Sequence, residues 1–191
     1  MGPIKTYYWN VHPNFGDLLT TLLLRKFTDL ESVWSAPQEA ELVVAGSVLD
    51  KLPAGWTGVV AGAGKLHEKT VLDLSQAVVL ALRGPLSAKD VKGNFAIGDP
   101  GLLADELVPL QEKEHDLGVI PHWTDRSLAS DPRFLKYHPK LIDVRNDPIK
   151  VITDIGKCKK IVTCSLQRST PLKVKSKSAA TGRFGVKHAV E

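Results

Sequence analysis

The chain has 191 residues, 43% of them hydrophobic, enough for one complete domain and part of another. Its net charge is +4, but six cations and one acid follow residue 164, so residues 1–164 carry 19 cations against 20 acids. The globular part therefore lacks the basic field typical of nucleic-acid-binding domains, and no specific nucleic-acid partner is expected. There is no apolar run of membrane-spanning length and no signal-peptide layout, which predicts a cytoplasmic protein without a membrane span.

Two cysteines, Cys158 and Cys164, form neither a metal-ligand pattern nor a disulfide framework. Their apolar neighbours predict two reduced thiols in or near a buried strand. The sequence therefore indicates no metal site and no cofactor.

The segment from Tyr7 to Phe27 organises the first half of the chain. A strand is predicted at residues 4–9, followed by a polar loop and a helix opened by Asp17. Apolar residues recur at helical spacing, which predicts one buried face; they are Leu18, Leu19, Leu22, Leu23 and Phe27.

This strand–loop–helix arrangement directs backbone N–H groups and the positive end of the helix dipole toward the carboxyl end of the strand. Open α/β sheets bind anionic ligands at that position. Asn14 and Gly16 lie in the loop and are candidates for substrate binding. A turn with a helix cap and no ligand explains residues 14–17 equally well.

Further strands are predicted at residues 32–35, 41–45, 58–61 and 77–82. The last is an almost continuous apolar run, which favours a central parallel strand buried on both faces. Strands alternate with helices, so the predicted class is α/β, with a Rossmann-like parallel sheet and helices on both faces over residues 1–110.

A Gly-Ala-Gly-Lys loop at residues 62–65 has some likeness to a phosphate-binding loop. Its spacing is wrong, because Val59 occupies the position of the required glycine and Leu66 replaces the Ser or Thr that would bind Mg²⁺. We interpret it as a glycine-rich loop at the end of a strand that lines a cleft.

Two charged residues follow predicted strands. Arg83 ends the apolar run and precedes Gly84 and a short helix, and Asp99 lies between glycine and proline in a tight loop. Both positions suit a functional site. The alternatives are that Arg83 only pairs with a carboxylate and that Asp99 only forms a turn.

The second half begins with a charged linker at residues 111–116. A new α/β pattern at residues 117–166 predicts an incomplete second Rossmann-like unit, with a helix beginning at Asp147 and an apolar face of isoleucines 149, 152 and 155. His122 follows its first strand and either assists acid–base chemistry or packs beside Trp123. The basic stretch at residues 167–191 is predicted to be a disordered tail.

The order of these motifs resembles that of the polysaccharide pyruvyl transferases, above all bacterial members that decorate exopolysaccharides. The resemblance covers residues 4–166 and rests on several short stretches. They are residues 14–17, 46–49, 62–65, 82–85, 98–102, 117–122, 143–148 and 161–166.

The resemblance implies a glycosyltransferase-B-like architecture of two domains. It also implies transfer of the enolpyruvyl group of phosphoenolpyruvate, the donor, to hydroxyls of a saccharide acceptor, forming a pyruvate ketal. Catalytic roles are then expected for Asp17, Asp99 and His122. Substrate-binding roles are expected for Asn14, Gly16, Arg83, Gly84, Arg145 and Ser165.

The resemblance ends abruptly. Family members follow the Ser-Leu pair of residues 165–166 with His-Gly, whereas this chain has Gln167 and Arg168. We therefore expect a C-terminally truncated or altered member that self-associates through the open edge of its second unit. Either activity or inactivity of this shortened chain is compatible with the resemblance. The alternative functions are a nucleotide-sugar glycosyltransferase and a non-catalytic α/β module whose basic tail binds anions.

Overall fold

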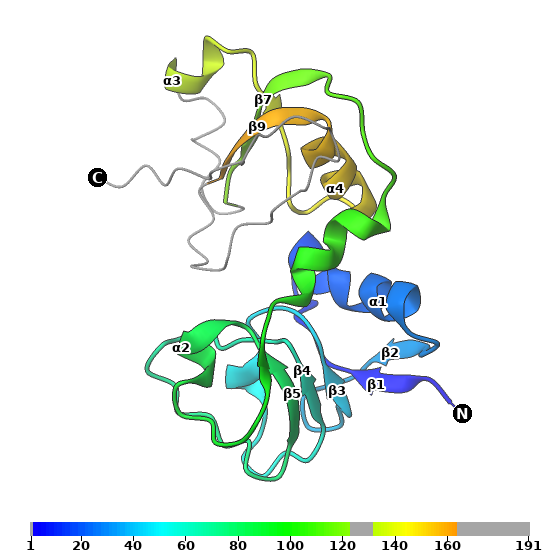
Figure 1. Ribbon diagram of the computed structural model, residues 1–191, viewed down its shortest axis with the longest axis vertical. Helices are drawn as coiled ribbons and strands as arrows, with labels where there is room; N and C mark the ends of the chain where they lie inside the picture. Colours follow the sequence, from blue (N-terminus) through cyan, green and yellow to red (C-terminus); the bar gives the residue numbers. More distant parts are fainter. Residues whose placement is uncertain (1, 123–131, 164–191) are drawn as a thin grey trace. The chain divides into compact units, whose positions relative to one another are not determined.

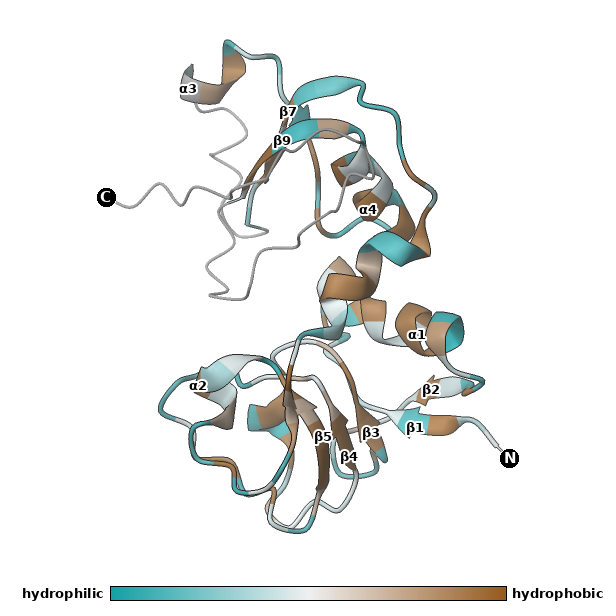
Figure 2. Ribbon diagram, viewed as in Figure 1, coloured by the Kyte–Doolittle hydropathy of each residue, from teal (hydrophilic) through white to brown (hydrophobic). Residues whose placement is uncertain are grey.

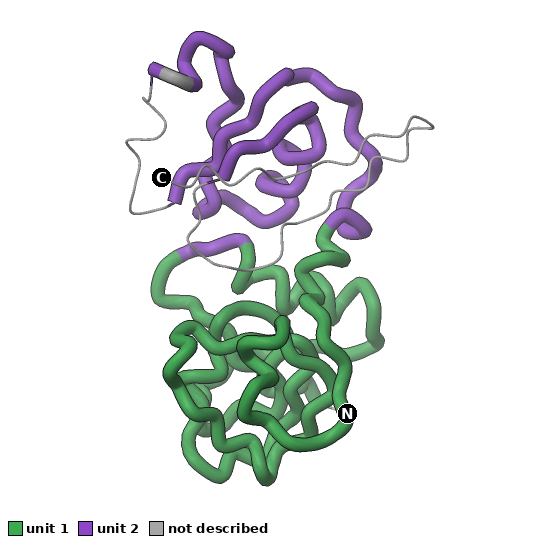
Figure 3. The backbone as a smooth tube through the Cα atoms, turned by 60° about the vertical axis from the view of Figure 1, so that its left-hand side comes forward, with its two compact units in different colours: residues 1–12, 16–104 green, residues 13–15, 105–191 purple. Residues whose placement is uncertain are grey.

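The computed structural model describes residues 2–122 and 132–163, in two compact units (Figure 3). Unit 1 comprises residues 2–12 and 16–104, and unit 2 comprises residues 13–15 together with the described residues from 105 onward. Cys164, Ser165 and the predicted tail at residues 167–191 lie outside the described residues, as does Trp123.

Unit 1 is built on a six-stranded parallel sheet with the strand order β2-β1-β3-β4-β5-β6 (Figure 1). The parallel sheet with flanking helices confirms the predicted α/β class. The strands are β1 (Ile4–Thr6), β2 (Ser32–Trp34), β3 (Leu42–Val43), β4 (Val59–Ala61), β5 (Val78–Leu82) and β6 (Ala96–Ile97). The helices are α1 (Phe15–Phe27) and α2 (Gly84–Ala88), with 3-10 turns η1 (Leu49–Lys51) and η2 (Pro100–Leu107).

The alternation of side chains along the strands gives unit 1 two apolar layers. Leu42 of β3 packs with Leu24 of α1 in one layer. Its neighbour Val43 points the other way and packs with Val60 and Leu82 in the larger layer. The strands β3, β4 and β5 accordingly stand out as hydrophobic in Figure 2.

The expectation that β5 is buried on both faces was wrong. Leu82 is fully buried, but Val78 is 55% exposed and Leu80 is 57% exposed. Helix α2 packs near β5 and β6, and its Ala88 joins the layer that contains Leu82. Val79 packs against the same layer as Leu82, because the pairing of β5 with β4 shifts by one residue between Val79 and Ala81 and changes which side chains face that layer. Val78 and Leu80 are left largely exposed by the described residues.

Helix α1 also differs from its prediction. It begins at Phe15, so Asp17 lies inside the first turn instead of opening the helix. The buried stripe contains Leu19, Leu23 and Leu24, whereas Phe27 is 46% exposed. The face is rotated because Leu24, not Phe27, points at the apolar layer of β3.

Unit 2 holds a three-stranded parallel sheet with the order β8-β7-β9. Its strands are β7 (His115–Ile120), β8 (Lys140–Leu141) and β9 (Cys158–Thr163), and its helices are α3 (Pro132–Leu135) and α4 (Pro148–Gly156). Asp147 caps α4 as predicted, because its carboxylate accepts a hydrogen bond from the Lys150 N–H at 3.1 Å.

Two predictions for unit 2 were wrong in detail. Strand β7 begins at His115, inside the predicted linker, because its backbone pairs with β9 from Cys158 onward. The charge of Asp116 is compatible with a strand, since its carboxylate pairs with Lys159 of β9 at 2.7 Å. Ile149 of α4 is 36% exposed, and the buried face is completed by Val151.

Cys158 is buried in the core of unit 2, as expected. In the described ranges, no helix is long and apolar enough to cross a membrane.

The one-sided burial of β5 predicts unequal effects of two similar substitutions. Leu82→Ala should lower the free energy of unfolding by about 2–5 kcal/mol, since it opens a cavity in the larger apolar layer. Leu80→Ala should change it by no more than about 0.5 kcal/mol, because that side chain is largely in solvent. Urea unfolding of both variants measures the difference, and equal losses would show that β5 is covered on both faces.

Candidate functional site

The candidate site of unit 1 lies where its parallel strands end. Hydrogen bonds between neighbouring chains continue beyond the strands, from Arg83 N to Ala63 O at 3.0 Å, from Gly64 N to Gly46 O at 2.9 Å, and from Gly98 N to Leu82 O at 3.0 Å. The loops that follow β3, β4, β5 and β6 therefore remain in register with one another. Side chains from four separate segments are brought to one edge of the sheet.

Two glycines leave room for charged side chains at this edge. A Cβ atom on Gly46 would collide with the Asp17 carboxylate, and one on Gly64 would lie 2.7 Å from Nε of Arg83. Gly46 also has a φ of +90°, a conformation that L residues rarely adopt. The glycines that follow β3 and β4 thus allow Asp17 and Arg83 to lie directly against the backbone.

Arg83 is the central residue of the site. Its Nη2 donates a hydrogen bond to Ser47 Oγ at 2.6 Å. Burial lowers the pKa of the guanidinium, and the negative charges of Asp99 and Asp17 oppose that shift. The chain enters α2 at the next residue, Gly84. Its φ of +76° favours glycine, although a Cβ atom there would meet no other atom within 4 Å.

Asp99 lies near Arg83, and Tyr7 lies near Asp17. The Asp99 carboxylate accepts a hydrogen bond from Gly101 N at 2.8 Å, so the residue does form the turn considered in the sequence analysis. Burial raises the pKa of Tyr7, and the nearby Asp17 charge adds to the effect. We call Asp17, Ser47, Arg83 and Asp99 the charged cluster.

The charged cluster combines two carboxylates, one hydroxyl and one guanidinium. It offers acceptors and donors side by side, and its three charged groups sum to a formal charge of −1 at neutral pH. Such a set can hold a ligand rich in hydroxyl groups, or orient a hydroxyl whose proton a carboxylate accepts. Among the described residues, no group of three or more His, Cys, Asp or Glu side chains is placed to hold a metal ion.

Lys65 of the glycine-rich loop faces the interior. Its side chain is 3% exposed, and its Nζ lies 3.1 Å from Thr70 O and 3.5 Å from the Asp90 carboxylate. Its backbone N–H donates to Ser87 Oγ of α2 at 3.2 Å. This lysine therefore fastens the loop to the fold, which is unlike the phosphate contact of a P-loop lysine.

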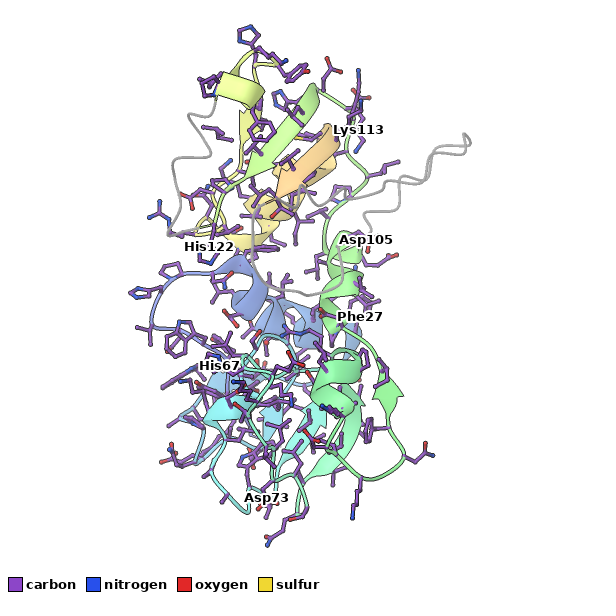
Figure 4. All side chains as sticks on the ribbon, turned by 90° about the vertical axis from the view of Figure 1, so that its left-hand side faces the viewer. Phe27, His67, Asp73, Asp105, Lys113 and His122 are labelled. Carbon is purple, nitrogen blue, oxygen red and sulfur yellow. The ribbon has the colours of Figure 1, made fainter. Side chains whose placement is uncertain are left out.

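Other predicted site residues belong to unit 2. Asn14 and Arg145 come near each other, because the neighbouring residues Phe15 and Val144 share a hydrogen bond of 2.9 Å between N and O. The Arg145 side chain pairs with Asp143 at 2.5 Å, and this pairing raises the pKa of Arg145. His122 follows the end of β7 and is labelled in Figure 4.

The other two predicted site residues, Gly16 and Ser165, have no described role in the charged cluster. Gly16 precedes Asp17 in the first turn of α1 and belongs to unit 1. Ser165 lies outside the described residues. Ser47 and Tyr7 were not selected from the sequence, although the Gly-Ser pair after a predicted strand was a signal that Ser47 lies at the same edge as Arg83.

Fold and site together define an α/β protein with a charged cluster at the carboxyl edge of a parallel sheet. Neither a protein-family model, nor a curated protein, nor a solved structure matches the chain.

The glycine contacts predict how the cluster responds to an added methyl group. Gly64→Ala should displace the Arg83 guanidinium and lower the free energy of unfolding by about 1–3 kcal/mol, since the new Cβ lies too close to a partly buried side chain. Gly98→Ala is the matched control, because a Cβ there meets no atom within 4 Å. Thermal unfolding and the NMR signal of Arg83 Nε–H measure both effects. An unmoved Arg83 signal in Gly64→Ala would contradict the predicted contact.

A second prediction concerns Asp50 of η1, which holds the loop after Lys65. Burial alone would raise the pKa of Asp50, but hydrogen bonds from the Thr70 side chain and from the N–H groups of Leu66 and His67 outweigh burial and lower it. Because the pKa is lower in the folded state, this carboxylate stabilises the fold above its ordinary value of 3.8, and the contribution disappears as pH falls through the folded-state value.

Asp50→Asn should therefore cost about 1–3 kcal/mol at pH 7. The difference from the unmodified protein should shrink below pH ~4, where the native carboxylate also becomes protonated. Urea unfolding across the pH range measures it, with Glu68→Gln in the exposed part of the same loop as control. A difference that stays constant down to pH 2–3 would rule out the carboxylate as its source.

Proposed function

We propose that the protein is a transferase of the polysaccharide pyruvyl transferase type. In this proposal it transfers the enolpyruvyl group of phosphoenolpyruvate to a saccharide in the synthesis of cell-surface polysaccharide. The observation that carries the proposal is the charged cluster, in which Arg83 bonds Ser47 beside Asp17 and Asp99 at the carboxyl edge of a parallel sheet. The order of sequence motifs along residues 4–166 supports the same assignment.

The reaction requires two hydroxyl oxygens of the acceptor to bond to C2 of phosphoenolpyruvate. The bond from C2 to the phosphate oxygen breaks, and inorganic phosphate leaves. C3 gains a proton and becomes a methyl group, so one hydroxyl proton is balanced at C3 and the other departs with the phosphate. A base near the hydroxyl and an acid near C3 are the groups that this chemistry needs.

Unit 1 supplies suitable bases. Asp17 is 7% exposed and lies against Gly46, while Asp99 is fixed by its hydrogen bond from Gly101 N. Either carboxylate can take the proton of a saccharide hydroxyl. The positive charge of Arg83 interacts favourably with both carboxylates. These positions are rigid because the loops continue the hydrogen-bonding pattern of the sheet.

Unit 2 carries, by itself, the residues that the resemblance assigns to the donor. His122 is the proposed acid for C3, and Arg145 the proposed cation for the phosphate or carboxylate of phosphoenolpyruvate. Release of Arg145 from Asp143 would be required before it binds an anion. A Rossmann-like, glycosyltransferase-B-like arrangement, a cytoplasmic location and self-association through the sheet edge of unit 2 belong to the same proposal.

The proposal predicts release of phosphate from phosphoenolpyruvate in the presence of saccharide acceptors. Arg83→Gln should lower the rate by about 10²-fold or more, the size of effect seen when one preorganised charged donor is removed. Arg25→Gln, at an exposed position near the end of α1, is the matched control. Phosphate release by the full chain measures the rate, and thermal unfolding checks that both variants are folded.

A thermal-shift titration separates this proposal from its rivals. Stabilisation by phosphoenolpyruvate but not by nucleoside diphosphates supports pyruvyl transfer. Stabilisation by a nucleoside diphosphate alone indicates a nucleotide-sugar glycosyltransferase. Absence of both, together with steeply salt-dependent binding to polyanions, indicates a non-catalytic module.

A further inference from the structure

An exposed tryptophan stands at the same sheet edge as the charged cluster. Trp9 follows the carboxyl end of β1 and is 36% exposed. Lys51 of η1 approaches its ring, with Nζ 5.8 Å from the ring centroid. η1 begins two residues after Ser47, so Lys51 belongs to the segment that also carries the hydrogen-bond partner of Arg83.

The surrounding backbone fixes the strand end that bears this ring. Tyr7 N donates to Leu42 O of β3 at 3.1 Å, which continues the pairing of β1 beyond Thr6. The indole N–H of Trp34 donates to Tyr8 O at 3.0 Å from the other side. The backbone of Tyr7 and Tyr8, just before Trp9, is thus held on both sides. Anchoring the chain next to a surface ring reduces the conformational freedom that ligand binding would remove.

The charge balance at this edge gives an anion no net attraction. Arg83 already bonds Ser47 and lies near two carboxylates, so the charged cluster has a formal charge of −1. Lys51 brings the formal charge of the edge to zero, so a phosphate or carboxylate would meet no net positive charge there. A neutral polyol needs none, because its hydroxyls donate to the carboxylates and accept from the guanidinium and the Lys51 ammonium.

We infer that Trp9, Lys51 and the charged cluster of unit 1 form a saccharide subsite, in which one face of a pyranose ring stacks on the Trp9 indole. An aromatic face for the C–H groups of a sugar and polar groups for its hydroxyls meet the two chemical needs of such a ligand. The inference deepens the proposed function, since it assigns this subsite to the acceptor and leaves the anionic donor to other residues.

The test uses the full chain and methyl pyranosides of the glucose, mannose and galactose configurations. Saturation-transfer NMR detects magnetisation passed from protein to sugar ring protons, and a titration gives Kd. Trp9→Leu should weaken binding of the best pyranoside about two- to tenfold, the factor expected for one aromatic stacking contact. Phe27→Leu is the matched control, because Phe27 is equally an exposed aromatic residue (Figure 4) but lies at the far end of α1 from Asp17.

The outcomes are distinct. Sugar binding that is weakened by Trp9→Leu and by Asp99→Asn, but unaffected by Phe27→Leu and by 10 mM inorganic phosphate (a concentration about 10⁴ times a typical micromolar Kd), supports the subsite. No transfer to any of the pyranosides overturns it, and so does equal binding by Trp9→Leu or displacement of the sugar by phosphate. The binding assay contains no phosphoenolpyruvate and is read separately from the phosphate-release assay. Sugar binding in the first without phosphate release in the second rejects pyruvyl transfer and keeps the subsite. Phosphate release without sugar binding rejects the subsite and keeps pyruvyl transfer.

Discussion

The site of unit 1 depends on backbone hydrogen bonding that continues past the ends of the strands. Three such bonds tie the loops after β3, β4, β5 and β6 to their neighbours at 2.9–3.0 Å. Loops fixed in this way present side chains with little conformational freedom left to lose. That register brings Asp17 and Asp99 close enough to affect the charge of Arg83, although up to 82 residues separate the three in the chain.

Two glycines leave space for charged side chains at the same edge of the sheet. Gly46 and Gly64 sit side by side, joined by a hydrogen bond, and each lacks the Cβ that would collide with Asp17 or Arg83. A partly buried guanidinium is costly unless it is paired and hydrogen-bonded. Ser47 accepts a hydrogen bond from Arg83, and the charges of Asp99 and Asp17 offset part of the cost of its burial. The cluster thus offers both donors and acceptors to a ligand.

The two units place different demands on their charged residues. In unit 1 the charged cluster is partly or fully buried, and the charges of Asp99 and Asp17 oppose the lowering of the Arg83 pKa by burial. In unit 2 many charges serve the sheet itself, as in the pair between Asp116 and Lys159 across β7 and β9. Arg145 is likewise engaged with a near neighbour, Asp143. Charge at a strand end is therefore weak evidence for a site until its partners are known.

Much of the fold could be predicted, because hydrophobic periodicity and helix-start signals are local. The α/β alternation, the strand at residues 32–34 and the cap at Asp147 all follow from residues close together in the chain. The one-sided exposure of β5 could not be foreseen, since Val78 and Leu80 are as apolar as residues of a buried strand. Which of its side chains are covered depends on the register shift against β4 and on segments distant in the chain that form the larger apolar layer. For the same reason Phe27 was wrongly assigned to the buried stripe of α1.

The sequence by itself determined that charged residues follow strands and that glycines stand near them. Those facts are local, and they sufficed to select Asp17, Arg83 and Asp99. Only the tertiary structure decided that the charges of Asp17 and Asp99 act on Arg83. It alone decided that Ser47 is the partner of Arg83 and that Lys65 is buried instead of available to a ligand. The physical reason is that strand order and register are set by contacts between distant segments, which no local pattern specifies.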